Sequence, residues 1–286
     1  MADAVELLIE PRRRPVGAGH VRRLLPFRLR RTVGPFIFCD LMGPEALAPG
    51  VAMKVDAHPH IGLSTLTYLV EGRAVHRDST GAVQTIEAGA VNWMTAGAGV
   101  THTERSHPDD VDTTLDVFGA QLWVALPTEA EDGPPGFEHC PASEVPWERS
   151  ADVEVKVVVG SAFGMSAPIT GSSPLALVDL TLDGGAIRLP TDQPERAVVA
   201  LSGDLRVDGT VLPEGSLAVV ERDQTPQISG DGRALVLAGE PVGDRHIWWN
   251  FVHSDPEAIE DAKARWEWQR FPLVPDDHDE WVPLPG

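Results

Sequence analysis

Two short polar motifs constrain what this chain can fold into more than any other feature. His58 and His60 are separated by one residue, and so are His102 and Glu104. Successive side chains of a β-strand point to opposite faces, so each pair projects from one face of its strand. If the two strands are neighbours, three imidazoles and one carboxylate meet at a single point. The alternative is two unrelated pairs, one on a turn and one beside a surface acid.

The chemistry of these side chains favours a metal site over that alternative. Imidazole and carboxylate together suit a divalent first-row transition metal, and four protein ligands leave room for a substrate or a water molecule. Each pair has the period of a strand and is flanked by β-branched runs, so the pattern predicts one metal held by His58, His60, His102 and Glu104. Such a mixed set does not select a metal by affinity alone. Iron is predicted first, with nickel, manganese, cobalt, zinc and copper as alternatives.

The spacing of apolar runs predicts an all-β fold. Among the 286 residues, 27 are glycine and 25 are proline, and long helical periodicities are scarce. Runs of strand type recur about every eight to twelve residues with turn signals between them, a pattern typical of a β-barrel or β-sandwich. These runs cover residues 64–70, 74–77, 83–86, 91–94 and 120–126.

The second half of the chain repeats the pattern of the first. Residues 201–217 resemble residues 69–91 in the spacing of their glycines and aliphatic residues, which implies one supersecondary unit used twice. Residues 151–240 contain no histidine, so the second unit is predicted to lack this kind of metal site. With no gaps assumed, the four ligand positions are occupied in the second unit by Leu189, Thr191, Ile228 and Gly230.

Charge is distributed unevenly along the chain. The formal net charge is −20, yet residues 1–35 carry eight arginines against three acidic residues. An acidic surface repels phosphate backbones, so direct nucleic-acid binding by the whole protein is disfavoured. The arginine-rich segment could form a basic patch for nucleic acid. The simpler interpretation is that it pairs with acidic groups of its own chain or of a neighbour.

Several features predict a cytoplasmic protein. The first residues lack the basic region and apolar run of a signal peptide. No apolar run approaches the ~18 residues that a membrane span needs, so no membrane partner is predicted. The two cysteines, Cys39 and Cys140, cannot form a disulfide framework; they fit a reduced compartment and are interpreted as small buried residues.

The chain ends with a strand and a helix. Residues 246–253 form a last apolar run, and Ser254 and Glu257 then have the spacing of a capping box. The pattern predicts a helix over residues 257–270, followed by an acidic tail.

These motifs and their order resemble the pirins, a two-domain family of the cupin superfamily. The resemblance covers most of the first 130 residues, and residues 245–251 are similar to a bacterial subset of the family. The segments that carry it are residues 22–26, 33–36, 58–72, 76–79, 93–97, 102–104 and 121–127.

The resemblance implies an all-β chain of two cupin-type (jelly-roll) barrels packed face to face, with a short C-terminal helix. It places an N-terminal metal-binding domain at residues 1–130, a linker or crossing loop at 131–150, and a second cupin domain without metal at 151–286. It also carries the ligand roles onto His58, His60, His102 and Glu104, the same four residues that the strand periods select.

Two functions follow from the resemblance. The first is a metal-dependent oxygenase of the quercetin 2,3-dioxygenase type, which takes a flavonol-like aromatic substrate and O2, with Glu104 as the catalytic base. The alternative is a non-catalytic, redox-responsive regulator that binds a transcription factor or a metabolic enzyme. A sugar isomerase or epimerase is less favoured, because the basic pocket residues it needs are not evident.

Two departures from the family concern the mouth of the site. Ile61 and Ser64 stand where family members commonly have arginine and glutamate, which leaves the ligand set intact but changes the residues expected to recognise a substrate. His76 and His107 each lie in or beside a turn and are interpreted as solvated residues without a role. No role is assigned either to His139, His246, His253 and His278.

Overall fold

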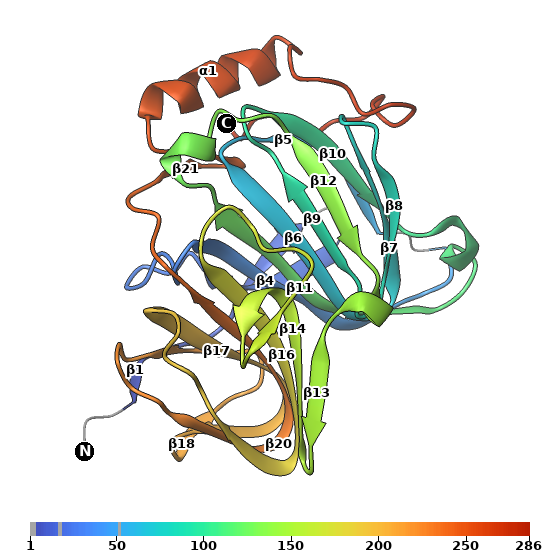
Figure 1. The fold of residues 1–286 in the computed structure, drawn as a ribbon. Helices are drawn as coiled ribbons and strands as arrows, with labels where there is room; N and C mark the ends of the chain where they lie inside the picture. The colour runs from blue at the N-terminus through green and yellow to red at the C-terminus, as the bar shows by residue number, and fades with distance from the viewer. Residues whose placement is uncertain (1–3, 17–18, 51–52) are drawn as a thin grey trace. The chain divides into compact units, whose positions relative to one another are not determined.

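The computed structural model describes residues 4–16, 19–50 and 53–286, and most of them lie in β-strands (Figure 1). The chain forms two compact units. The apolar barrel comprises Met1–Arg13, Arg22–Asp40 and Ser143–Pro241. The histidine barrel comprises Arg14–Val21, Leu41–Ala142 and Val242–Gly286. Each unit is therefore built from segments that lie far apart in the sequence.

The apolar barrel contains one sheet, whose main path runs β1-β19-β17-β20-β16-β14-β13 with antiparallel neighbours; β15 pairs with β14 and β18 with β17. Its strands are β1 (Val5–Ile9), β13 (Trp147–Ser150), β14 (Val153–Ala162), β15 (Met165–Ser166), β16 (Leu175–Arg188), β17 (Glu195–Val207), β18 (Thr210–Leu212), β19 (Leu217–Val220) and β20 (Gln227–Gly239).

Alternation of side chains builds the core of this barrel. Along β14, Val153, Val155 and Val157 are buried, while Glu154 and Lys156 between them are more exposed. Valine, leucine, isoleucine and alanine fill the cluster that results. Two of the four positions equivalent to the predicted metal ligands, Leu189 and Ile228, are buried in this apolar cluster.

The histidine barrel carries a four-stranded sheet, β5-β10-β7-β8, and a seven-stranded sheet, β12-β9-β6-β11-β4-β3-β2. Strands β2, β3 and β4 contain residues of both units. The strands are β2 (Arg12–Val16), β3 (Gly19–Leu25), β4 (Phe36–Leu47), β5 (Lys54–His60), β6 (Leu63–Glu71), β7 (Arg73–Asp78), β8 (Val83–Glu87), β9 (Val91–Thr95), β10 (Val100–Arg105), β11 (Leu115–Ala125) and β12 (Gly136–Cys140). Short 3-10 turns lie at η1 (Pro108–Asp110), η2 (Thr128–Ala130) and η3 (Ala142–Glu144).

The compact units differ from the predicted domain boundaries at both ends of the chain. Strand β1 pairs with β19, so the first described residues join the apolar barrel rather than the predicted domain 1–130. Residues 242–286 join the histidine barrel rather than the predicted domain 151–286. Both differences arise from pairing over long sequence separations, which local patterns do not encode. Residues 1–3 of the predicted first domain lie outside the described residues.

The segment 131–150, predicted as a linker or crossing loop, contains two strands. Strand β12 pairs with β9 in the histidine barrel, and β13 pairs with β14 in the apolar barrel. The compact units meet in sequence at Ala142 and Ser143. The sequence of residues 131–150 is acidic and rich in proline and has no apolar alternation that would predict these strands. Their pairing is made by backbone hydrogen bonds, which leave no pattern in the sequence.

The C-terminal region is more elaborate than predicted. Residues 246–253 form a hairpin of β21 (His246–Trp248) and β22 (Phe251–His253) instead of one strand. Helix α1 (Pro256–Glu267) is capped by Asp255, whose side chain accepts a hydrogen bond from the Glu257 N–H. The predicted cap, Ser254, instead donates its hydroxyl to a buried carboxylate described below.

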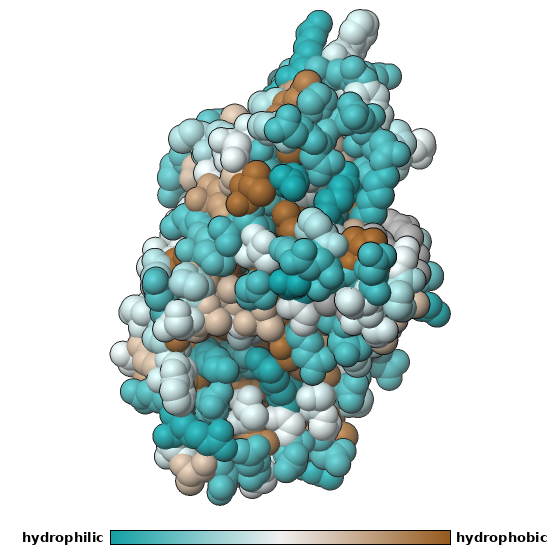
Figure 2. Space-filling model, turned by 90° about the vertical axis from the view of Figure 1, so that its right-hand side faces the viewer, coloured by the Kyte–Doolittle hydropathy of each residue, from teal (hydrophilic) through white to brown (hydrophobic). Residues whose placement is uncertain are grey.

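Arginines of the N-terminal segment bind groups of their own chain. Arg23 makes two hydrogen bonds to Asp40, both 2.9 Å long, and Arg30 lies 3.3 Å from Glu195. The face of the molecule in Figure 2 is mainly hydrophilic, with small separate apolar patches. These contacts support the interpretation that the segment pairs with acidic groups of this chain.

In the described part of the chain, no helix is both long and apolar enough to cross a membrane.

Candidate metal centre

Strands β5 and β10 bring the two histidine motifs together. They pair antiparallel, with His102 opposite His58 and Val100 opposite His60. Because side chains alternate along each strand, all three imidazoles lie on one face of the four-stranded sheet. All three are buried, with exposed fractions of 9% for His58, 1% for His60 and 2% for His102.

The three imidazoles offer nitrogen atoms to one point. One ligand atom from each of the three residues lies within 4.8 Å of the others, and the Nε2 atoms of His60 and His102 are 3.1 Å apart. The ring centroids of His58 and His102 are separated by 4.1 Å. Among the described residues, this is the group of histidine, cysteine and acidic side chains with the spacing of a metal site.

Backbone carbonyls set the tautomers of two of these rings. Nδ1 of His58 lies 2.8 Å from the Asp56 carbonyl oxygen, and Nδ1 of His60 lies 3.2 Å from the Asn250 carbonyl oxygen. A carbonyl oxygen can only accept a hydrogen bond, so Nδ1 carries the proton in both neutral rings. Nε2 is then left with a free lone pair, the form in which imidazole binds a metal.

Burial keeps the imidazoles uncharged at neutral pH. Burial is the largest cause that lowers the pKa of His58 to about 4; the hydrogen bond to the Asp56 carbonyl opposes it, and nearby His76 and Arg105 add to it. Burial also places the pKa values of His60 and His102 well below the usual 6.5, and the neighbouring imidazoles add to the effect. Three neutral imidazoles in one buried place are ready to bind a cation without first losing protons.

Glu104, the predicted fourth ligand and base, lies two residues beyond His102 on the same face of β10. It stands opposite His76 of β7, and its carboxylate does not belong to the group of nitrogens within 4.8 Å. The pairing of β10 with β5 is irregular between these two residues: His102 stands opposite His58, but Glu104 stands opposite Val55. Burial raises the pKa of Glu104, partly opposed by His76. Its roles as ligand and as base stay predictions.

The interpretation of His76 as a solvated turn residue is wrong, because its side chain is buried. Its side chain is 3% exposed, and its ring centroid lies 5.2 Å from that of His102. Nε2 of His76 lies 2.9 Å from Oδ2 of Asp78, which is completely buried. Burial alone would raise the pKa of Asp78, but hydrogen bonds from His76 and Thr80 outweigh it and lower this pKa. The period of His76 and Asp78, two residues apart like the metal motifs, is the sequence signal that identifies the pair.

Aromatic side chains lie beside the imidazoles. The Trp123 ring stands edge-on to His60 at a centroid distance of 5.1 Å, and Phe137 stacks on His76 at 4.7 Å. Phe137 belongs to β12, in the segment that was predicted to be a linker. The site is therefore lined by flat apolar surfaces as well as by imidazoles.

The two departures from the family have structural partners. Ile61 is buried in a cluster with Phe251, Ile259 and Phe271 of the C-terminal segment. The Ser64 hydroxyl lies 3.1 Å from that of Thr95. Ile61 therefore packs the end of the histidine-bearing strand β5 against the C-terminal segment.

The remaining histidines and cysteines lie outside the imidazole group. Nδ1 of His107 accepts a hydrogen bond from the Asp109 N–H at the start of η1, and His139 contacts Asn92 at 2.6 Å. His253 is buried and accepts a hydrogen bond from the Asp255 N–H. Cys39 and Cys140 are buried, and burial raises the pKa of Cys39. These thiols are small buried residues, as predicted.

Comparison with known proteins places this architecture in a family. Residues 18–124 match the family model named Pirin, and residues 177–272 match the model named Pirin C-terminal cupin domain. The chain belongs to the pirin family. The predicted all-β fold of two cupin domains with a single helix is confirmed.

Several proteins are similar to this pirin over most of their length. A "Pirin-like protein" of Caulobacter vibrioides is 43% identical over 98% of this chain and 99% of its own length. A "Putative quercetin 2,3-dioxygenase" of Pseudomonas aeruginosa is 39% identical over 88% of this chain and 80% of its own. The crystal structure of quercetin 2,3-dioxygenase from Acinetobacter baumannii has a TM-score of 0.91 at 32% identity, covering 98% of this chain and 95% of that one.

The buried neutral imidazoles predict acid sensitivity of the metal-free protein. The pKa of His58 is about 4 in the folded state and about 6.5 in the unfolded state, so the unfolded state binds more protons between these values. The free energy of unfolding is therefore expected to fall as pH drops from 6.5 to 4, by about 3 kcal/mol from His58 alone. His60 and His102 act in the same direction, whereas Glu104 opposes them.

Urea unfolding of chelator-treated protein at several pH values from 7 to 4 measures this loss. Substitution His58→Gln removes one titrating ring and should flatten the curve. A free energy of unfolding that stays constant between pH 6.5 and 4 would contradict the prediction.

Proposed function

We propose that this pirin is a metal-dependent oxygenase that opens flavonols with O2, as a quercetin 2,3-dioxygenase does. The observation that carries the proposal is the buried group of three neutral imidazoles, two of them with Nε2 free of its proton, beside the aromatic ring of Trp123. Two relatives that match this chain over most of their length are named as a putative quercetin 2,3-dioxygenase and a quercetin 2,3-dioxygenase. Their names support the choice of flavonols as the substrate class.

The side chains present fit a divalent transition metal. His58, His60 and His102 would hold it through nitrogen, and Glu104 is proposed as the fourth ligand from the next inward position of β10. Such a metal would supply Lewis acidity towards a bound hydroxyl, and a redox-active one such as iron would also supply redox chemistry towards O2. Iron is proposed first, with nickel, manganese, cobalt, zinc and copper as alternatives.

Residues of the chain provide proton transfer and orientation. A flavonol has a hydroxyl next to a ketone, and loss of the hydroxyl proton makes the ring electron-rich enough to react with O2. Glu104 is proposed to accept that proton, and the raised pKa of its carboxyl makes it a better base than an exposed glutamate. Trp123 and Phe137 offer flat apolar surfaces that would align the rings of the substrate and exclude water.

Aerobic turnover tests the proposal directly. Protein loaded in parallel with iron, nickel, manganese, cobalt, zinc or copper is mixed with quercetin and related flavonols, while O2 consumption and carbon monoxide release are followed. Opening of the central ring of the flavonol, with release of one ring carbon as carbon monoxide, should consume one O2 for each carbon monoxide formed. If no metal-loaded form consumes O2 with any flavonol, the oxygenase proposal fails. The alternative, a non-catalytic, redox-responsive regulator that binds a transcription factor or a metabolic enzyme, is then favoured.

One metal ion per chain is expected, and it should belong to the histidine barrel. The apolar barrel presents an aliphatic interior, in which Leu189 and Ile228 stand where ligands would be needed. Elemental analysis of purified protein gives the stoichiometry, and an anomalous difference map gives the position. A second metal peak within residues 151–240 would contradict the prediction.

A further inference from the structure

The metal-ligand candidate His60 depends on a residue far away in the sequence. Its Nδ1–H donates to the carbonyl of Asn250, which lies 190 residues further along the chain. The corresponding acceptor for His58 is the carbonyl of Asp56, in its own strand. Because the partner of Nδ1 fixes the tautomer and the ring orientation of a ligating histidine, His60 is oriented by the C-terminal hairpin.

Backbone contacts hold that hairpin against the end of β5. The Val252 N–H donates to the Ile61 carbonyl at 3.2 Å, and Ile61 forms a parallel bridge with Phe251. Gly62 has a φ of +66°, and a Cβ at this position would collide with the Val252 carbonyl oxygen. The lack of a side chain at Gly62 therefore lets the hairpin approach the backbone directly after the histidine motif.

A buried carboxylate closes the base of the hairpin. Glu131 accepts hydrogen bonds from the Ser254 N–H at 2.9 Å and the Ser254 hydroxyl at 2.6 Å, and its Oε1 lies 2.5 Å from Nε of Arg245. Arg245 and Ser254 are the residues directly before and after β21 and β22. The side chains of Glu131 and Arg245 are 0% and 4% exposed. Both ends of the hairpin are thus tied to one point.

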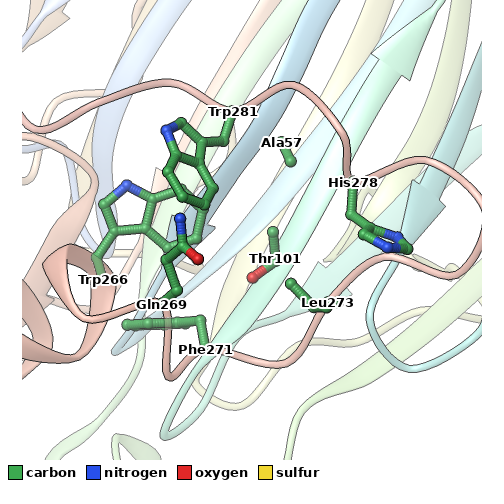
Figure 3. Close-up of a pocket in the computed structure, with 8 residues that line it drawn as sticks. All are labelled: Ala57, Thr101, Trp266, Gln269, Phe271, Leu273, His278 and Trp281. Carbon is green, nitrogen blue, oxygen red and sulfur yellow. The ribbon is translucent and has the colours of Figure 1, made fainter.

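The tail of the chain pairs with β5, the strand that carries His58 and His60. The Ala57 N–H donates to the Glu280 carbonyl at 3.2 Å, and the Val282 N–H donates to the Ala57 carbonyl at 2.9 Å. Figure 3 shows Trp266 and Trp281 beside Ala57 and Thr101, the residues that precede His58 and His102. The tail therefore adds a short parallel bridge at the outer edge of β5. The two tryptophans line a pocket with Ala57 and Thr101, whose side chains point away from the imidazoles.

An ion pair extends this contact to β10. Asp277 accepts hydrogen bonds from the Thr103 hydroxyl at 2.7 Å and from Arg105 at 2.8 Å. Thr103 and Arg105 alternate with His102 and Glu104, so they point to the opposite face of the strand. Both strands that carry the histidines are held by the C-terminal segment.

We propose that residues 245–282 form a clamp that positions His60 for metal binding, with the Asn250 carbonyl as the positioning group. This inference rests on the proposed metal site and adds that the affinity of this site is set by a segment outside the strands that supply the ligands. Loss of an outer hydrogen-bond partner typically weakens metal binding about 10–100-fold. Release of the hairpin should therefore raise the Kd for the metal by about that factor.

The double variant Glu131→Leu with Arg245→Met opens the base of the hairpin without leaving an unpaired buried charge. Its matched control is Asp179→Leu with Arg233→Met, a carboxylate–arginine pair of the apolar barrel. Two readouts are taken: the Kd for Co2+ and Zn2+ by chelator competition, and the histidine tautomers of the metal-free protein by 15N NMR. We expect a Kd raised about 10–100-fold and a lost Nδ1–H signal for His60, with that of His58 unchanged.

The single variant Gly62→Ala gives a second test if the double variant fails to fold. Its methyl group meets the Val252 carbonyl and pushes the hairpin away, whereas Gly81→Ala, also at a positive φ, meets no atom within 4 Å. A Kd within about twofold of wild type in the variants that fold overturns the proposal. So does a weaker Kd with an unchanged His60 tautomer, because the clamp would then act only on stability. The tautomer is measured without metal, so this test is separate from failure of the wild-type protein to bind metal or turn over a flavonol.

Discussion

Substitution of His102 by alanine should leave the protein folded and almost free of metal. His102 contributes one of the three buried nitrogens, and its Nε2 lies 3.1 Å from that of His60. Loss of an outer partner of a ligand already costs about 10–100-fold in affinity, so loss of the ligand itself should raise the Kd by more than about 100-fold. Elemental analysis after purification and chelator competition with Co2+ both measure this change.

An exposed histidine provides the control for this substitution. His20→Ala removes an imidazole from β3, where the side chain is exposed, and should retain about one metal per chain. Circular dichroism establishes that both variants keep their strands. An unchanged metal content in His102→Ala would show that the imidazole group is not the metal site.

Glu104→Gln should retain metal and lose most of its turnover. Glutamine keeps the size of the side chain but cannot accept the proton of a flavonol hydroxyl. General-base assistance is typically worth about 10²–10⁴-fold in rate, so kcat with quercetin should fall by that factor. The three imidazoles and the amide oxygen of the glutamine still offer four ligand atoms, so metal should be retained, and kcat is expressed per bound metal ion. Wild-type turnover in this variant would remove Glu104 from the mechanism.

The pH dependence of wild-type turnover tests the same role. Only the ionised carboxylate can act as a base, and burial raises the pKa of Glu104. The rate should therefore fall as pH drops through that raised pKa, and this acidic limb should vanish in Glu104→Gln. Glu87→Gln, a change of the same kind at an exposed position of β8, should reproduce the wild-type profile. The acidic limb must be measured with metal content monitored, because protonation of the imidazoles also releases metal.

Local patterns in the sequence determined the character of the fold and the centre of the site. Alternation with a two-residue period predicted strands such as β6 and β9, and it placed His58 with His60 and His102 with Glu104 on common faces. The absence of histidine from residues 151–240 of the sequence predicted that the second barrel lacks this kind of metal site. These features are readable because strand geometry relates each side chain to its near neighbours in sequence.

Tertiary structure alone decided which distant segments complete each unit. The pairing of β1 with β19 and the bond from His60 to the Asn250 carbonyl join residues that are far apart in sequence. The position of His76 beside His102 required the pairing of β7 with β10. Backbone hydrogen bonds of this kind carry no side-chain signature, because every non-proline residue offers the same N–H and C=O groups. For this reason the sequence specifies the imidazoles, whereas the folded chain specifies which of their nitrogens are free to bind a metal.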